Sequence, residues 1–184
     1  MKVSIIIPVF NEANTIYKIL KKVNKIKKIK KEIIVINDGS TDNTKKIIEK
    51  KCKGLFNKFI SYNLNRGKGY ACREGFKNVT GKIVIIQDAD LEYDPKDYSK
   101  LLDPILKNKT NIVYGSRVLK GGVRIRPRSF DVIIRLSANH FLTFMSNLLN
   151  NHNLTDAHTC YKVFKSNLIK KIKLYEDGFN FCPE

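Results

Sequence analysis

The feature that most constrains this chain is a run of four apolar β-branched residues, Ile83–Ile86, followed closely by Asp88 and Asp90. A short, uninterrupted apolar run is typical of a strand that is covered on both faces, as in the parallel sheets of α/β proteins. Open α/β sheets bind ligands just beyond the carboxyl ends of their strands. The two aspartates are therefore predicted to lie where a ligand binds.

Two carboxylates separated by a single alanine repel each other unless a cation lies between them. A divalent cation with oxygen ligands removes this conflict, and magnesium typically uses one or two carboxylates together with substrate phosphates. The alternative interpretation is a pair of hydrated loop aspartates at the end of a strand. The Asp–Ala–Asp pattern alone favours neither interpretation, so the rest of the sequence has to decide.

The order of the other elements predicts a doubly wound α/β fold with short turns. Strands are expected at residues 2–9, 32–37, 59–62 and 111–114, and the helices between the strands at 16–26, 42–53, 70–78 and 95–105. Right-handed crossovers bring all the strand ends to one edge of such a sheet. Asp38, Asp88 and Asp90 are therefore expected to share that edge with Glu12, and Arg117 to face them.

Two glycines beside basic residues open the third predicted helix, in the stretch Asn65-Arg66-Gly67-Lys68-Gly69. The free backbone N–H groups and the dipole of a helix start suit an anion, so this stretch predicts an anion site. It matches neither the phosphate-binding loop with Gly-Lys-Ser/Thr nor the dinucleotide fingerprint, because the glycine spacing differs from both.

The second half of the chain begins with a glycine- and arginine-rich loop at residues 120–128. A broad apolar pattern then predicts a helix at 130–149, with Phe130, Ile134, Phe141, Met145 and Leu148 on one stripe. Core packing is the expected cause of the stripe, and a helix lying on a membrane surface is the alternative. A polar link at 156–162 and a short helix near 167–172 follow.

The charge balance favours an anionic partner. Thirty-five Lys and Arg against 17 Asp and Glu give a net charge of +18, which suits nucleic acid, acidic lipids or phosphorylated substrates. The lysines of helix 16–26 are interpreted as a hydrated face. The four cysteines lack metal-ligand spacing and indicate reduced thiols, and the three histidines are scattered. Neither a secretory signal nor a membrane-spanning segment is expected.

Five separate stretches together resemble one family. They are Val3–Glu12, Ile36–Asp42, Asn65–Gly69, Gln87–Asp90 and Gly115–Arg117, and they occur in this order. In this combination the chain resembles the family-two glycosyltransferases with the GT-A fold, and most of all the branch of dolichyl-phosphate mannose and glucose synthases. The segments 156–162 and 181–184 resemble that branch too. The resemblance implies a mostly parallel central sheet with helices on both faces.

The resemblance also implies roles for individual residues. The nucleotide-sugar donor would be held by Pro8, Phe10, Glu12, Ile36, Asp38, Asp88, Ala89 and Asp90. A Mg²⁺ or Mn²⁺ ion would be held by Asp88 and Asp90, with Glu92 nearby, and the acceptor would meet Arg117, Arg135 and Asp156. Lys68 is a candidate for neutralising the phosphates of the donor, a role that its charge alone suggests.

The predicted function is an inverting transfer of a hexose from a GDP-mannose or UDP-glucose type donor to a polyprenyl or dolichyl phosphate. We expect one catalytic domain, 1–184, with a nucleotide-sugar half at 1–92 and an acceptor half at 93–184 that appears truncated relative to the family. The expected location is peripheral, on the anionic cytoplasmic face of a membrane. A phosphate acceptor is already anionic near neutral pH, since its second pKa is ~6, and needs no general base.

Three other functions remain open at this stage. A family-two enzyme acting on a saccharide hydroxyl would need a carboxylate base, for which Asp156 is the candidate. A basic nucleic-acid-binding domain would fit the charge, but aromatic residues for base stacking are not interleaved with the lysines of helix 16–26, so nucleic acid is not an expected partner. An Asp-x-Asp phosphatase fits less well, because Glu92 follows the motif and the motif ends the fourth predicted strand.

Overall fold

The computed structural model describes residues 1–117, 130–151 and 153–178, and for 130–136 it describes the backbone alone. Its centre is a six-stranded sheet in the order β3-β2-β1-β4-β6-β5. Strands β1 (Lys2–Val9), β2 (Lys30–Asp38), β3 (Lys58–Tyr62) and β4 (Ile83–Ile86) are parallel. Strands β5 (Ile112–Tyr114) and β6 (Lys162–Lys165) complete the sheet. The expected α/β architecture with a mostly parallel central sheet is confirmed.

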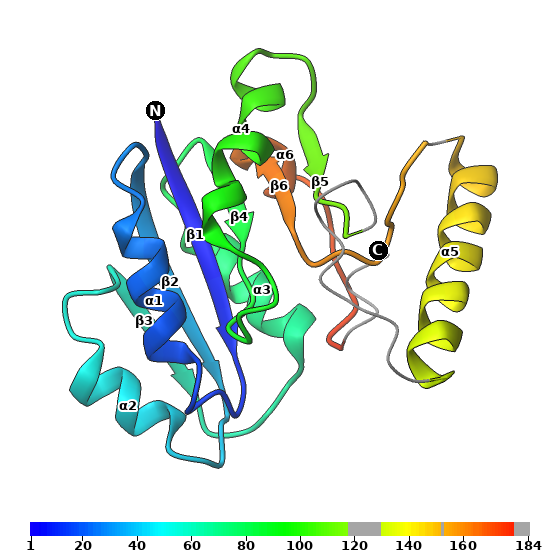
Figure 1. Ribbon diagram of the computed structural model, residues 1–184. Helices are drawn as coiled ribbons and strands as arrows, with labels where there is room; N and C mark the ends of the chain where they lie inside the picture. The colour runs from blue at the N-terminus through cyan, green and yellow to red at the C-terminus, as the bar shows by residue number, and fades with distance from the viewer. Residues whose placement is uncertain (118–129, 152, 179–184) are drawn as a thin grey trace.

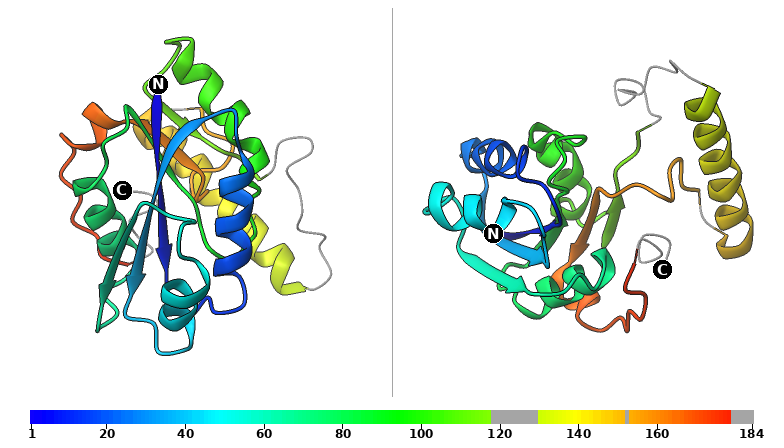
Figure 2. Two further views of the ribbon diagram at one scale, coloured as in Figure 1. Left: turned by 90° about the vertical axis from the view of Figure 1, so that its left-hand side faces the viewer. Right: turned by 90° about the horizontal axis from the view of Figure 1, so that it is seen from below.

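Helices cover both faces of this sheet because successive side chains of its strands point to opposite sides. Ile5 and Ile7 of β1 pack with α1 (Ile16–Lys25), α2 (Thr44–Lys51) and α4 (Tyr98–Leu106), which the short 3₁₀ helix η1 (Pro95–Asp97) precedes. Ile6 packs on the opposite face with α3 (Lys68–Lys77) and α6 (Ser166–Ile169). The arrangement of these two layers around the sheet can be followed in Figures 1 and 2.

Strand β6 corrects the sequence interpretation, which expected a polar link ending at Lys162. The strand lies between β4 and β5 and is antiparallel to both, with Val84 opposite Phe164 and Val113 opposite Val163. Because β5 is antiparallel to β6, it runs in the same direction as β4. Its carboxyl end therefore reaches the edge of the sheet that carries Asp88, as predicted.

Helix α5 (Phe130–Asn150) corrects a second interpretation. Figures 1 and 2 show it to one side of the sheet, with residues 153–161 leading from it toward β6. Phe141 and Leu148, expected to pack into the core, have exposed fractions of 63% and 66%. Core packing is therefore not the reason for the apolar stripe on the part of this helix whose side chains are described. Within the described residues, no helix is both long and apolar enough to cross a membrane.

Candidate active site

A pocket of about 590 Å³ lies beyond the carboxyl ends of the central strands. Three strand ends contribute to it: Pro8 and Val9 end β1 and lead into Phe10 and Glu12, Asp38 ends β2, and Asp88 follows β4. Its wall includes most of the residues proposed from the sequence to bind the donor or metal: Pro8, Phe10, Glu12, Asp38, Lys68, Asp88, Ala89, Asp90 and Glu92. The structure thus brings together side chains that lie up to 84 positions apart in the sequence, from Pro8 to Glu92.

Ile36 is the exception in the donor set. Its side chain is fully buried between the sheet and α3, where it packs with Ala71 and Phe76 rather than in the pocket wall. A role of Ile36 at the donor would have to involve its backbone. The assignment stays a prediction.

Hydrogen bonds from Gln87 hold the turn after β4 in place. The sequence analysis included this residue in a family stretch but gave it no role of its own. Its buried side-chain amide donates to the carbonyl oxygen of Asp88 at 2.9 Å, and its Oε1 accepts from the hydroxyls of Tyr98 and Tyr161, each at 2.8 Å. Burial raises the pKa of both tyrosines, so they remain neutral donors. The one signal in the sequence for this role was a polar residue directly after an apolar strand.

Leu91 gives this turn its shape. Its φ of 70° lies in the left-handed region, which a residue other than glycine or asparagine seldom adopts. The bend lets the backbone N–H of Glu92 donate to Oδ1 of Asp90 at 2.9 Å. A strained backbone of this kind persists only where the surrounding structure enforces it. Here the bend at Leu91 holds the carboxylates of Asp90 and Glu92 at the pocket.

The carboxylates of this turn favour a nearby cation. Burial and, to a lesser extent, the charge of Asp88 raise the pKa of Asp90 above its usual value, even though a backbone hydrogen bond lowers it. Burial and the charge of Asp90 likewise raise the pKa of Glu92, while Arg117 acts in the opposite direction. A positive charge placed between these groups would relieve the repulsion.

Lys68 supplies one such charge. Its Nζ is 2.5 Å from Oδ1 of Asp88 and 3.1 Å from Sγ of Cys160, and the side chains of Lys68 and Asp88 are both 12% exposed. Burial alone would lower the pKa of Lys68, but the Asp88 carboxylate outweighs it and the net pKa is raised. Lys68 is therefore a permanent cation in the pocket wall, suited to anionic phosphate groups.

The start of α3 differs from the anion site expected there. The N–H groups of Arg66 and Gly67 donate to the two carboxylate oxygens of Asp38, at 3.0 and 2.7 Å. Those of Gly69 and Tyr70 donate to backbone carbonyls of residues 177 and 178. These four donors are used within the protein, so the expectation of a free anion site at this helix start was wrong. Asp38 orders the loop as well as lining the pocket.

Asn11 is a further residue that the sequence analysis passed over. Its φ of 55° is left-handed, and its side-chain oxygen accepts from the N–H groups of Thr41 and Asp42 at 2.8 and 3.3 Å. The turn after β1 is thereby tied to the turn after β2. Phe10, which precedes Asn11 and is 44% exposed, is held at the mouth of the pocket by this bridge.

Arg117 and Asp156 form a bidentate ion pair near the acidic turn. Nε of Arg117 is 2.8 Å from Oδ2 of Asp156, and Nη2 is 3.0 Å from Oδ1. Asn139 of α5 donates to the same Oδ1 at 3.1 Å. Burial would raise the pKa of Asp156, but the hydrogen bonds from Arg117 outweigh it and lower that pKa. Asp156 is therefore a weak base, which argues against the general-base role considered for it.

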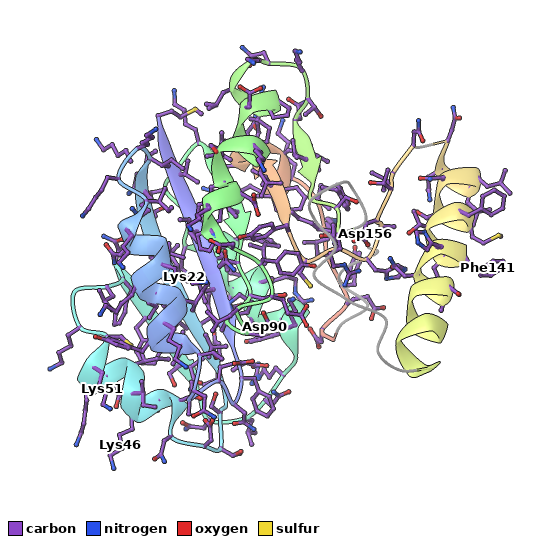
Figure 3. All side chains as sticks on the ribbon, viewed as in Figure 1. Lys22, Lys46, Lys51, Asp90, Phe141 and Asp156 are labelled. Carbon is purple, nitrogen blue, oxygen red and sulfur yellow. The ribbon has the colours of Figure 1, made fainter. Side chains whose placement is uncertain are left out.

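Arg135 remains unplaced at the level of its side chain. It belongs to α5, within the segment whose side chains lie outside the described residues. Its predicted contact with the acceptor phosphate stays a prediction. Figure 3 shows Asp156 between the Asp90 side of the site and α5.

The donor set fits a hard divalent cation only if substrate oxygens complete it. Among the residues that the structure describes, no three His, Cys, Asp or Glu side chains form a metal-binding group. Asp88 and Asp90 nevertheless lie in one pocket with a cation, Lys68, already on Asp88. The pair of carboxylates, though not the Lys68 contact, matches the manner in which magnesium is held, by one or two carboxylates plus phosphates.

Comparison with solved structures first defines the class of fold. Glucosyl-3-phosphoglycerate synthase from Mycobacterium tuberculosis, crystallised with Mn²⁺, UDP-glucose and phosphoglyceric acid, matches 99% of this chain and 62% of its own chain. The TM-score is 0.74 and the sequence identity 18%. The likeness shows that this chain has the GT-A fold.

The sequence then identifies the family. Residues 4–173 match the model of glycosyl transferase family 2, and the chain belongs to this family. It is 34% identical over 123 residues to dolichol-phosphate mannosyltransferase of Pyrococcus furiosus, a match that covers 66% of this chain and 35% of the relative. It is 31% identical over 205 residues to dolichyl-phosphate beta-glucosyltransferase of Saccharomyces cerevisiae, covering 98% of this chain and 60% of the relative. The chain thus spans between a third and two thirds of the length of these relatives.

Proposed function

We propose that this chain transfers a hexose from a nucleotide-sugar to a polyprenyl or dolichyl phosphate at an anionic membrane surface, with Mg²⁺ or Mn²⁺ as cofactor. The observation that carries the proposal is the convergence of Asp88, Asp90 and Lys68 on one pocket. Arg117 is close enough to oppose the rise in the pKa of Glu92. Family membership and the names of the two relatives support the reaction class.

The donor is proposed to lie in the pocket between the strand ends. The base and ribose would meet Phe10, Glu12 and Asp38, and the diphosphate would lie toward Lys68 and Asp88. Asp88 and Asp90, with Glu92 nearby, would hold the divalent cation, which supplies Lewis-acid charge to the leaving diphosphate. Lys68 adds a fixed positive charge at the same place, where negative charge develops as the sugar–phosphate bond breaks.

The acceptor is proposed to be a phosphate monoester. Its oxygen would attack the anomeric carbon as the bond to the diphosphate breaks, which inverts the configuration there. Such a nucleophile is anionic at neutral pH, with a second pKa of ~6, and needs positioning rather than deprotonation. Arg117 provides positioning charge, and the lowered pKa of Asp156 fits an acceptor that requires no general base.

A thermal-shift screen of GDP- and UDP-sugars with and without Mn²⁺ or Mg²⁺ tests the donor site. Wild type is expected to show a metal-dependent rise in melting midpoint, because a ligand that binds the native state stabilises it. Asp90→Ala should lose the metal-dependent part of that rise. Asp97→Ala removes an exposed carboxylate on η1 and is the matched control. A full metal-dependent shift in Asp90→Ala would refute the assignment.

A transfer assay then tests the acceptor. Labelled donor is supplied with polyprenyl phosphate in vesicles, and in parallel with oligosaccharides. Label recovered in the lipid phase, and released by mild acid, supports the proposal. Label found only in saccharide would instead establish a family-two enzyme acting on a hydroxyl group.

A further inference from the structure

The polar side of α5, rather than its apolar side, faces the rest of the protein. Asn139 donates to Asp156, and Asn147 exchanges hydrogen bonds of 2.8 and 2.9 Å with the backbone of Leu154. Between them, the Thr143 hydroxyl accepts from the backbone N–H of Ala157 at 3.2 Å. Positions four residues apart share one face of a helix, so these three side chains form a single inward stripe.

The apolar residues cover much of the remaining surface. With 3.6 residues per turn, they fall on an arc centred opposite the polar stripe, and they are exposed. We name these residues the α5 arc: Phe141 (63%), Leu142 (47%), Phe144 (62%), Leu148 (66%) and Leu149 (77%). In Figure 3, Phe141 points away from the sheet. An exposed apolar patch with a polar border marks an interaction site.

We propose that the α5 arc inserts into the interface of an anionic lipid bilayer, and that Asn139 couples this insertion to the Arg117–Asp156 pair. The proposal rests on the proposed function and deepens it, because it names the part of the chain that meets the membrane. Residues 137–151 contain neither acidic side chains nor lysine or arginine, so inserting the arc buries none of these charges. Membrane-surface helices bind through apolar area of this kind.

Charge decides between a bilayer and a second copy of the chain. Each copy carries a net charge of +18, so pairing two copies brings like charges together. An anionic bilayer has the opposite sign. The basic residues on the described surface include Lys22, Lys46 and Lys51 of α1 and α2, which Figure 3 shows on the far side of the molecule from α5. Because exposed charges are screened beyond about 10 Å at 0.1 M salt, these lysines favour the approach to an anionic surface mainly at low ionic strength, whereas the arc provides the contact.

The coupling follows from a shared hydrogen-bond acceptor. Asn139 of α5 and Nη2 of Arg117 both donate to Oδ1 of Asp156, at 3.1 and 3.0 Å. A shift of α5 on the membrane therefore moves the carboxylate that orients Arg117. Asn139 is a positioning residue that acts through Asp156 on the group proposed to hold the acceptor phosphate.

Vesicle co-sedimentation, without donor or acceptor, tests the arc. The full chain should bind phosphatidylcholine vesicles that contain phosphatidylglycerol more tightly than pure phosphatidylcholine vesicles. Phe141→Ser with Leu148→Ser should weaken binding at least about tenfold, because two large apolar side chains no longer enter the interface. Leu106→Ser, at an exposed leucine of α4, is the matched control. Unchanged binding in the double variant would overturn the proposal, as would self-association that the double variant abolishes.

Acceptor kinetics test the coupling. Asn139→Ala should raise KM for polyprenyl phosphate in vesicles several-fold, leave KM for the donor unchanged and leave vesicle binding intact. Asn139→Gln, which keeps the amide donor, should recover part of the loss. Equal changes in both KM values would indicate a merely structural role and refute the coupling.

The proposed function and the membrane contact of the α5 arc can be refuted separately. If the chain binds vesicles through the arc but transfers sugar to no prenyl phosphate, the proposed function fails and the membrane contact stands. If it transfers sugar to a short, water-soluble prenyl phosphate but does not bind vesicles, the arc proposal fails and the function stands.

Discussion

The two sides of the candidate site are held in different ways. On the donor side, the turn after β4 is supported by Gln87, which makes hydrogen bonds in several directions with two tyrosines beneath it. On the acceptor side, Arg117 and α5 meet at one carboxylate, Asp156. A site held by many buried contacts is preorganised, whereas one in which a cation and a helix share a single carboxylate responds when that carboxylate moves. The donor side is thus built for rigidity and the acceptor side for adjustment.

The largest expected effect is on the acceptor side. Arg117→Ala leaves Asp156, whose side chain is fully buried, without its ionic partner, and should lower the free energy of unfolding at pH 7 by roughly 3–5 kcal/mol. Chemical denaturation measures this loss. Arg117→Ala combined with Asp156→Asn, which removes the unpaired charge, should be less destabilised than the single variant. Equal destabilisation of the two would show that the ion pair does not anchor this side.

The pH dependence of the same variant follows from the pKa of Asp156. In wild type this pKa is lowered, so the stabilisation is complete above the unfolded pKa of about 3.9 and is lost as pH falls through the folded value. Without Arg117, burial dominates and raises the pKa above the unfolded value. The stability difference between variant and wild type should therefore shrink as pH falls from 7 toward 4. A constant difference over this range would mean that the charge of Asp156 is not the source of the instability.

The next largest effect is on the donor side. Gln87→Met keeps the side-chain volume but removes the acceptor of two buried tyrosine hydroxyls, and should cost about 2–4 kcal/mol in the free energy of unfolding. Adding Tyr98→Phe and Tyr161→Phe removes the unsatisfied hydroxyls and should recover about half of the loss. Urea denaturation of the three proteins measures both steps. If the triple variant were no more stable than Gln87→Met, the hydroxyls would not be the source of the cost.

The same contrast explains how far the sequence predicts the structure. The donor side was predictable because Ile83–Ile86 and the other apolar runs mark strands whose ends must share an edge. Strand β6 was missed because Val163 and Phe164 are too short an apolar run between two lysines. Lys162 is buried with its ammonium group donating to the carbonyl of Thr159 and lying over the ring of Tyr114, contacts that no periodicity reveals.

The orientation of α5 could not be predicted for a related reason. Periodicity locates the apolar arc of a helix but does not say which side the rest of the protein occupies. That choice is made by Asn139, Thr143 and Asn147, whose partners lie seven to 17 residues further along the chain. Likewise, the N–H groups of Gly69 and Tyr70 at the start of α3 donate to residues 177 and 178, which lie more than 100 positions away.

The smallest effect concerns this last contact, which joins the start of α3 to residues 177 and 178. Arg73 donates to the carbonyl of Glu176 at 2.5 Å and pairs with Asp177, which is 59% exposed. Since an exposed pair contributes about 0.5 kcal/mol, Arg73→Ala should speed hydrogen exchange at the N–H groups of Gly69 and Tyr70 about twofold, with little change in global stability. Lys77→Ala, which removes another exposed pair of α3, is the control. Unchanged exchange would mean that Arg73 does not hold this segment, whereas a large loss of global stability would make the segment as integral to the donor side as Gln87.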